Sequence, residues 1–332
     1  MFRTCENTMN IQPGLKRWIC IGAVLLLAVA GTTIAGIQGT GIRALSTFGT
    51  VETGSDGGLS LNGQPYDTSH ARVVVNGRAG KVSELRSGHI VAAHASSHGK
   101  GSGAVADEII LESDVRGEVT SVNQANATFR VLGQTVHLTN DSILDPQIRP
   151  DDVRGLRNGT WVKVSAFERA DGSFVASRVD LDFAPGESQV RGVIQSLDST
   201  RQTLRIGALT VDYSTGQTHG VIAEGAVVLV RGLQTQTGGT LFASSVQAFS
   251  GFGRAGERGD IRGIVTQFAS TVDFEVNGQP VLTNDKTVYV LHGQPLGTDL
   301  EVRVTGRFDS SGVLIARKVQ ADVPNKAKRG PR

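Results

Sequence analysis

The chain has 332 residues, of which 39% are hydrophobic, only 5% are aromatic and 42 are glycine. This composition predicts many turns that join short strands of Val, Ile and Leu, and so an all-β fold. The formal net charge is +2, but three basic residues precede residue 18 and four lie in the last seven residues, which leaves the rest of the chain near neutral to slightly acidic. A groove for nucleic acid, which requires a basic face, is therefore not favoured.

The N-terminus carries a long apolar segment. Residues 1–17 form a basic flank, and residues 18–37 follow it without a charge. As a helix this segment would be about 30 Å long, enough to cross a bilayer as a retained anchor. The small residues after Ala30 also fit a cleaved signal peptide, and a buried soluble helix is the third alternative. Anchor and signal both place the downstream residues outside the cytoplasm, because the positive flank stays inside.

Beyond this segment one pattern recurs four times. A glycine opens an apolar strand at intervals of 68, 75 and 71 residues, at Gly49, Gly117, Gly192 and Gly263. An alanine of the last strand keeps the same register, at Ala106, Ala176, Ala243 and Ala316. The sequence therefore predicts four tandem β repeats, at 46–112, 114–183, 189–249 and 260–322, followed by a basic disordered tail at 323–332. Units this small are marginal alone, so neighbouring repeats are expected to pack on one another.

Each repeat is predicted to contain short strands joined by tight turns. Its second strand alternates apolar and polar residues, as at Leu59 and Leu61, which is typical of a half-buried strand. The tetrapeptide Asn-Gly-Gln-Pro, at 62–65 and 277–280, indicates a turn whose glycine has positive φ. A third strand, a connection, and two further strands complete the repeat.

The connection between the third and fourth strands suggests the kind of barrel. In the second repeat, Asp151 is expected to cap a single helical turn that ends at Gly159. Five strands with such a connection predict a small OB-like barrel. A five- or six-stranded barrel without the helix remains open. The predicted fold is thus a tandem array of four small five- or six-stranded, OB-like β-barrel modules behind one N-terminal hydrophobic helix.

An arginine precedes the landmark glycine in three repeats. The motif reads Val115-Arg116-Gly117, Val190-Arg191-Gly192 and Ile261-Arg262-Gly263. With a later Gly-x-x-Val-x-Val and a closing Ala-x-x-Val, this pattern resembles the bacterial family called domain of unknown function 5666. The resemblance covers residues 114–322 well and 46–112 more loosely, because Phe48 stands in place of the arginine. It implies an exported or envelope protein of bacterial type, and it brings no catalytic or binding residue to transfer.

Histidines form the densest group of ligand-capable residues. His89, His94 and His98 lie close in sequence, and imidazole suits Zn, Cu or Ni. The strand period would place His89 and His94 on opposite faces, so a polar, exposed hairpin is favoured over a shared ion. Asp141 and Asp145, with the pair Asp151-Asp152, lack the spacing of a calcium loop. No metal site and no cofactor are predicted.

Motifs for nucleophilic catalysis, metalloproteases and phosphate-binding loops are missing from the sequence, so an enzyme is not predicted. The favoured function is a non-enzymatic binding or structural role in the envelope, with a protein or polysaccharide partner and membrane attachment through 18–37. One alternative is oligonucleotide binding, for which the candidate aromatic residues are Trp161, Phe167, Tyr213 and Phe274. The other is an extracytoplasmic hydrolase built from scattered Ser, His and Asp residues.

Overall fold

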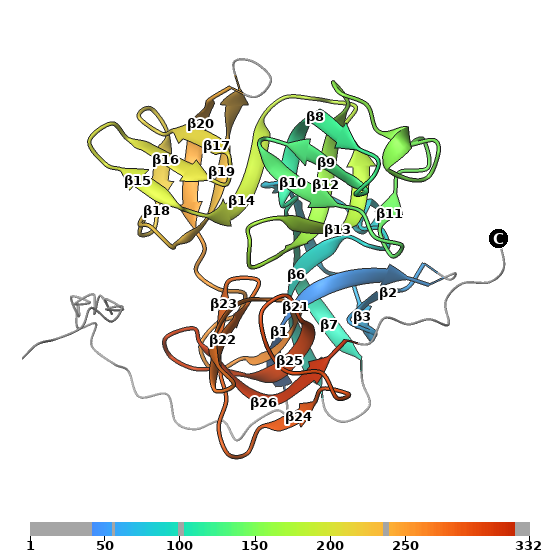
Figure 1. The fold of residues 1–332 in the computed structure, drawn as a ribbon. Helices are drawn as coiled ribbons and strands as arrows, with labels where there is room; N and C mark the ends of the chain where they lie inside the picture. Colours follow the sequence, from blue (N-terminus) through green and yellow to red (C-terminus); the bar gives the residue numbers. More distant parts are fainter. Residues whose placement is uncertain (1–41, 55–56, 99–102, 235–238, 323–332) are drawn as a thin grey trace, which may run out of the picture. The chain divides into compact units, whose positions relative to one another are not determined.

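Strands make up almost all the regular structure of the protein. The computed structural model describes residues 42–54, 57–98, 103–234 and 239–322, which all belong to one unit of the chain, Gly41–Arg332. Two 3-10 helices of three residues each are the helical elements of this part (Figure 1). The all-β prediction is confirmed for the described residues.

The predicted hydrophobic helix at 18–37 and the predicted tail at 323–332 lie outside the described residues. The two short helices that the described part does contain are not of a length or hydropathy that would span a bilayer. The membrane segment therefore stays a prediction from the sequence.

The strands of each predicted repeat close into a ring, and the four rings are numbered 1 to 4 in chain order. Ring 2 (residues 115–181) shows how the strands are connected. Its elements are β8 (Val115–Asn123), β9 (Thr128–Val131), β10 (Gln134–His137), β11 (Ile143–Leu144), η2 (Val153–Gly155), β12 (Trp161–Glu168) and β13 (Phe174–Leu181). β8 pairs with β9, β9 with β10, β10 with β13, β13 with β12, and β12 again with β8. The hydrogen bonds thus close a five-stranded, OB-like barrel, with η2 between its third and fourth strands.

Ring 4 (residues 258–321) closes in the same order. Its elements are β21 (Arg258–Ser270), β22 (Asp273–Val276), β23 (Gln279–Leu282), β24 (Val288–Val290), β25 (Glu301–Phe308) and β26 (Leu314–Ala321). The path runs from β21 through β22, β23, β26 and β25 back to β21. β24 adds a short parallel strand beside β26.

Rings 1 and 3 repeat this order. Ring 1 (residues 42–111) contains β1 (Ile42–Thr53), β2 (Leu59–Leu61), β3 (Gln64–Asp67), β4 (Arg72–Val75), β5 (Arg78–Ala79), η1 (Val82–Glu84), β6 (Ile90–His98) and β7 (Ala104–Leu111). Ring 3 (residues 188–248) contains β14 (Ser188–Val193), β15 (Ser196–Asp198), β16 (Thr203–Ile206), β17 (Leu209–Asp212), β18 (Gln217–His219), β19 (Val227–Gln234) and β20 (Leu241–Ala248). Ring 1 closes through β1, β2, β3, β7 and β6. In ring 3, β15 continues the course of β14 and pairs with β16.

Hydrogen bonds between first strands join the rings in pairs. β1 runs parallel to β21, with Leu45 opposite Arg258 and Phe48 opposite Ile261, so rings 1 and 4 share a 13-stranded sheet (Figure 1). β8 and β14 meet in antiparallel fashion and join rings 2 and 3 into a second 13-stranded sheet. The expectation that neighbours in sequence pack together did not include this pairing of the first ring with the last.

Apolar side chains fill the rings and also the contact between them. One cluster runs through rings 2 and 3 without a break. Another joins ring 4 to Phe48 and Ile90 of ring 1 and to Phe167 of ring 2. The Phe48 ring stacks on Phe252, with centroids 3.7 Å apart. The contact between rings is therefore built as a hydrophobic core.

The turn glycines agree with the prediction from the sequence, whereas the cap of the short helix η2 differs from it. The glycines of the two Asn-Gly-Gln-Pro turns, Gly63 and Gly278, both have a φ of +76°, as predicted. The cap of η2 is Asp152 and not Asp151, because the Asp152 carboxylate accepts a 2.8 Å hydrogen bond from the Arg154 N–H. The helix is only three residues long, so it ends before Gly159.

We expect Phe48→Ala to lower the free energy of unfolding by about 3 kcal/mol, because it removes a buried phenyl group from the contact between rings 1 and 4. Hydrogen exchange should also become faster for the amides of β1 that pair with β21. Phe183→Ala, at a side chain that is 70% exposed, is the matched control and should change stability little. Urea unfolding measures both variants, and equal losses would contradict a packed contact at Phe48.

Candidate functional site

An ion pair recurs where the first strand of a ring passes the end of the fifth. Arg116 Nε lies 2.6 Å from Asp182, and Arg262 contacts Asp322. Each acid stands six residues after the landmark alanine of its repeat. The arginine of the Val/Ile-Arg-Gly motif therefore ties the first strand of rings 2 and 4 to the fifth.

Rings 1 and 3 each lack one member of this pair. Phe48 replaces the arginine in ring 1, and Phe249 replaces the acid in ring 3. Arg191 accordingly lies over the Phe249 ring, with its guanidinium carbon 5.0 Å from the centroid. Glu112 of ring 1 instead forms a 2.8 Å ion pair with Arg231 of ring 3. Because Arg191 and Glu112 each lack a partner in their own ring, both take part in contacts between rings.

Arg191 belongs to a buried charged cluster that links three rings. Arg191, Asp114 and Glu168 are 9%, 5% and 3% exposed. Arg191 Nη1 lies 3.7 Å from Asp114 Oδ1, and Nη2 donates to the Asn277 carbonyl of ring 4 at 2.6 Å. Asp114 also accepts a 2.8 Å hydrogen bond from the Ala166 N–H. The guanidinium thus connects ring 3 to rings 2 and 4.

Burial changes the acidity of both carboxyl groups in this cluster. Removal from water raises the pKa of Glu168 to about 7, and the charge of Arg191 offsets only part of that rise. Burial likewise raises the pKa of Asp114 to about 6, again opposed by Arg191. Near neutral pH, Glu168 is therefore present in both its protonated and its ionised form.

Glu168 lines a cavity where rings 2, 3 and 4 meet. The cavity has a volume of about 240 Å³, and polar and apolar residues from the three rings together form its wall. Among them are Gln134 and Arg169 of ring 2, Gln195 of ring 3 and Thr266 of ring 4. The Arg169 guanidinium is 3.1 Å from a carboxylate oxygen of Asp299. This cavity is the candidate functional site.

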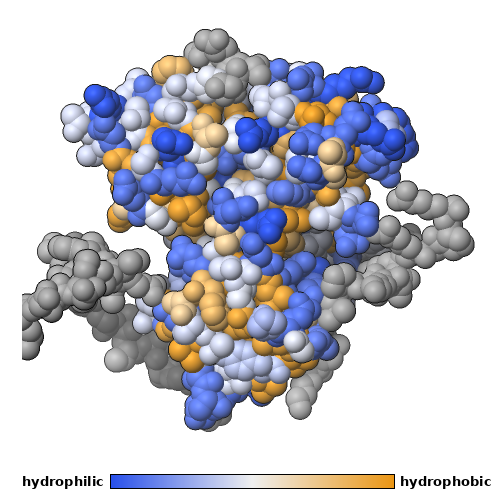
Figure 2. Space-filling view, in the orientation of Figure 1, coloured by the Kyte–Doolittle hydropathy of each residue, from blue (hydrophilic) through white to orange (hydrophobic). Residues whose placement is uncertain are grey.

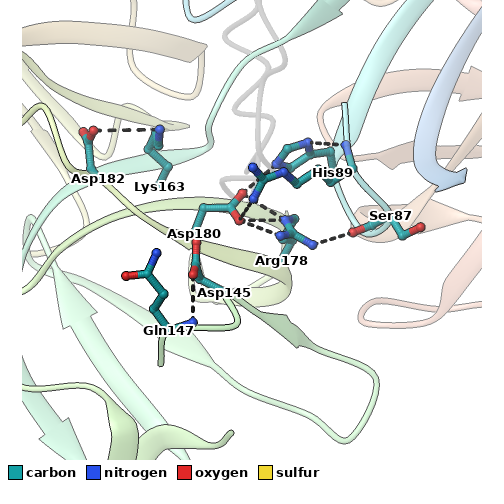
Figure 3. A network of polar contacts seen from close by, with 9 residues as sticks. Ser87, His89, Asp145, Gln147, Lys163, Arg178, Asp180 and Asp182 are labelled. Atoms are coloured by element: carbon teal, nitrogen blue, oxygen red, sulfur yellow. Dashed lines mark hydrogen bonds and ion pairs between the residues drawn. The ribbon is translucent and has the colours of Figure 1, made fainter. Parts of the chain in front are cut away.

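A second polar network joins rings 1 and 2 (Figure 3). His89 Nε2 lies 2.7 Å from Asp180, and Arg178 Nε donates to both oxygens of Asp180 at 2.8 and 2.9 Å. Arg178 Nη1 donates to the Ser87 carbonyl at 2.9 Å. Burial raises the pKa of Asp180, but the hydrogen bonds from His89 and Arg178 outweigh it and hold that pKa well below its usual range. The network joins two rings through a satisfied carboxylate.

The three candidate histidines do not share one site. His89 is 7% exposed, so the expectation of an exposed hairpin is wrong there: the Asp180 network of ring 2 covers it. His94 Nδ1 lies 3.1 Å from Ser46 Oγ, in a different network. The side chain of His98 lies outside the described part of the chain.

The aspartates that were considered as calcium ligands do not form a common site either. Asp145 accepts a hydrogen bond from the Gln147 N–H at 3.0 Å, and Asp152 caps η2. Within the described ranges, no three His, Cys, Asp or Glu side chains are grouped so that they would hold a metal ion.

Ser46, His94 and Glu257 bring together the residue types of a hydrolytic triad. Ser46 Oγ and Glu257 Oε2 both approach the same nitrogen, His94 Nδ1, at 3.1 and 3.6 Å. A catalytic triad instead uses opposite nitrogens of the imidazole, one for the serine and one for the acid. Ser46 is also buried in β1. This geometry differs from that of a Ser-His-acid hydrolase.

Most of the aromatic residues proposed for stacking on bases belong to the core. Phe167, Tyr213 and Phe274 are buried, and Trp161 is half-buried. A base needs an open aromatic face, which the three buried rings do not offer. The face in Figure 2 shows small hydrophobic areas interspersed with hydrophilic ones.

The family described as Domain of unknown function (DUF5666) matches three stretches of the chain, at residues 116–180, 191–247 and 262–320. Together these stretches make up more than half of the sequence, and the protein belongs to this family. They coincide with rings 2, 3 and 4. The resemblance seen in the Val/Ile-Arg-Gly motif is confirmed.

No curated protein matches the chain. Among solved structures, one titled "drosophila Unr CSD456" is similar at 17% sequence identity, over 64% of this chain and 99% of that chain. The TM-score of this match is 0.16.

We expect Glu168 to make the protein less stable as the pH rises from about 4.5 to about 7. A carboxyl whose pKa is raised on folding holds its proton more tightly in the folded state, so its stabilisation is full below the unfolded pKa and is lost as the pH passes the folded pKa. Each unit of the rise corresponds to about 1.4 kcal/mol.

Urea unfolding of the wild type and Glu168→Gln across this pH range tests that expectation. The difference between the two isolates Glu168, because every other acid is unchanged. Glu224→Gln, at an exposed acid that accepts a hydrogen bond from the Leu197 N–H, is the control. Parallel profiles for the wild type and Glu168→Gln would show that Glu168 titrates normally.

We expect Asp180→Ala to destabilise the protein by about 3 kcal/mol, because it leaves Arg178 buried without its carboxylate. The Arg178 side chain is 6% exposed. In contrast, Glu108→Ala breaks an ion pair with Arg72, whose side chain is 76% exposed, and should cost less than about 1 kcal/mol. Thermal and urea unfolding compare the two variants, and similar losses would mean that the Asp180 network contributes no more than a surface pair.

Proposed function

We propose that this protein is an exported bacterial envelope protein, held in the membrane through residues 18–37, that acts as a non-enzymatic binding or structural module. The uncharged segment at 18–37, behind Lys16 and Arg17, supports export and anchoring. Membership of a family of unknown function supports the repeat architecture without assigning a chemistry. The partner that we propose is another envelope protein or a polysaccharide.

We also propose that rings 1 to 4 are copies of one OB-like module. The same order of strand neighbours in each ring supports this. A register shift also falls at the same place in each fourth strand, between His94 and Ala95, Ser165 and Ala166, Arg231 and Gly232, and Thr305 and Gly306. A repeated bulge is a feature of a shared design.

The observation that carries the binding proposal is a shared frame with different exposed residues. The turn after the second strand has a glycine with positive φ in every ring, at Gly63, Gly133, Gly207 and Gly278. The large apolar residues left exposed differ from ring to ring, with Phe183 after ring 2, Val221 in ring 3 and Val288 in ring 4. A frame that stays constant while its surface varies suits recognition of a partner.

Fractionation of cells that express the full chain, with mass measurement of its N-terminus, tests this proposal. We expect the protein in the membrane fraction with 18–37 intact, and protease added from outside should digest the rings. Leu27→Arg, which places a charge inside the apolar segment, should leave the protein in the cytosol, while Leu27→Val should behave as the wild type. A wild-type protein that stays in the cytosol with an uncut N-terminus would refute export.

A further inference from the structure

The cavity between rings 2, 3 and 4 has the size of a small-ligand site. Its volume is about 240 Å³, slightly below the roughly 300–1,000 Å³ of pockets that hold drug-sized molecules. Three rings contribute to its wall, so it exists only in the assembled chain. A compound of few non-hydrogen atoms is the occupant that this volume allows.

Hydrogen-bond acceptors lie at one part of the wall. Gln134 Nε2 already donates to the Leu132 and Ile206 carbonyls, at 3.0 and 2.8 Å. Its Oε1 lies beside Gly207, where an added side-chain carbon would come within 2.7 Å of that oxygen. Since Gly207 also lines the cavity, the missing side chain leaves the Gln134 oxygen as an acceptor at this part of the wall.

Glu168 is the most deeply buried of the acidic groups in this wall, and it has few hydrogen-bond donors. The Glu168 side chain is 3% exposed, and it accepts a hydrogen bond from the Val193 N–H. No side chain of the described residues donates to it within hydrogen-bond distance, although an ionised carboxylate has two oxygens that accept several donors. A buried carboxylate with so few donors is costly, and the cavity is the side from which a further donor can approach.

Charge in the cavity favours a cation. Besides Glu168, the wall includes Asp171 and Glu275, while its basic residue, Arg169, is already paired with Asp299 at 3.1 Å. Asp171 accepts hydrogen bonds from Ser173 in its own turn, whereas Glu168 is the acid of the wall that is almost fully buried. Arg191 and Asp114 also act on Glu168, and the charge of Arg191 has the larger effect on its pKa.

We propose that this cavity binds a small organic ammonium compound, whose N–H groups donate to the Glu168 carboxylate and to the Gln134 side-chain oxygen. An ammonium group brings both the positive charge and the several donors that Glu168 lacks. This inference goes beyond the proposed function and does not depend on where in the cell the protein lies.

Isothermal titration of the full chain with 1,4-diaminobutane tests the proposal, and 1,4-butanediol serves as a neutral compound of the same length. We expect saturable binding of the diamine and no binding of the diol. Binding requires ionised Glu168, whose pKa is about 7, so the affinity should be about tenfold higher at pH 8 than at pH 6.

Two variants locate the binding. Glu168→Gln keeps an acceptor for the Val193 N–H but removes the charge, and it should weaken diamine binding by at least about tenfold. Glu224→Gln removes an exposed acid outside the cavity and should bind as the wild type. Equal binding of the diol, an unchanged affinity in Glu168→Gln, or no diamine binding at millimolar concentration would each overturn the proposal. None of these outcomes bears on the fractionation experiment, so failure of the ligand site and failure of the envelope proposal are distinguishable.

Discussion

The buried guanidinium of Arg191 is the constraint on which the junction of the rings depends. A charge removed from water must be paired and hydrogen-bonded, or the structure that buries it is not stable. Arg191 meets part of this demand: it lies near the Asp114 carboxylate, Nη2 donates to the Asn277 carbonyl, and the guanidinium lies over the face of Phe249, while Nη1 has no hydrogen-bond partner among the described residues. Separation of any of these rings would leave the guanidinium without part of this environment. The charge therefore couples the stability of rings 2, 3 and 4.

Departures from the repeat create this junction. If each ring kept both the arginine and the acid of its internal ion pair, as rings 2 and 4 do, neither group would be available to a neighbour. Phe48 and Phe249 interrupt that pattern once each. The freed Glu112 pairs with Arg231 of ring 3, and Phe48 stacks on Phe252. Two of the positions at which the four units differ thus contribute contacts between rings.

Local features of the fold were predictable from the sequence, and contacts between rings were not. Alternation at Leu59 and Leu61 and the glycines of the turns report backbone geometry within a few residues, so they located strands and hairpins correctly. Which first strands pair with each other is not encoded in that alternation, since an edge strand has the same pattern whether or not it has a partner. His89 was placed on the surface for the same reason, because its partner Asp180 lies 91 residues away. No pattern in the sequence indicated that Glu168 would be buried beside a cavity. Phe249, at the position of Asp182 and Asp322, was the visible sign that Arg191 has another role.

The buried carboxylates differ in what surrounds them, and this difference separates structure from binding. Asp180 receives hydrogen bonds from His89 and Arg178, which favour its ionised form and leave no demand for another donor. Glu168 is more deeply buried than Asp180, yet it receives one backbone N–H and faces a cavity. A glutamine would accept that same hydrogen bond without the cost of a buried charge. Contact between the rings therefore accounts for Asp180 but not for the charge of Glu168, and a cation in the cavity would supply the missing interaction.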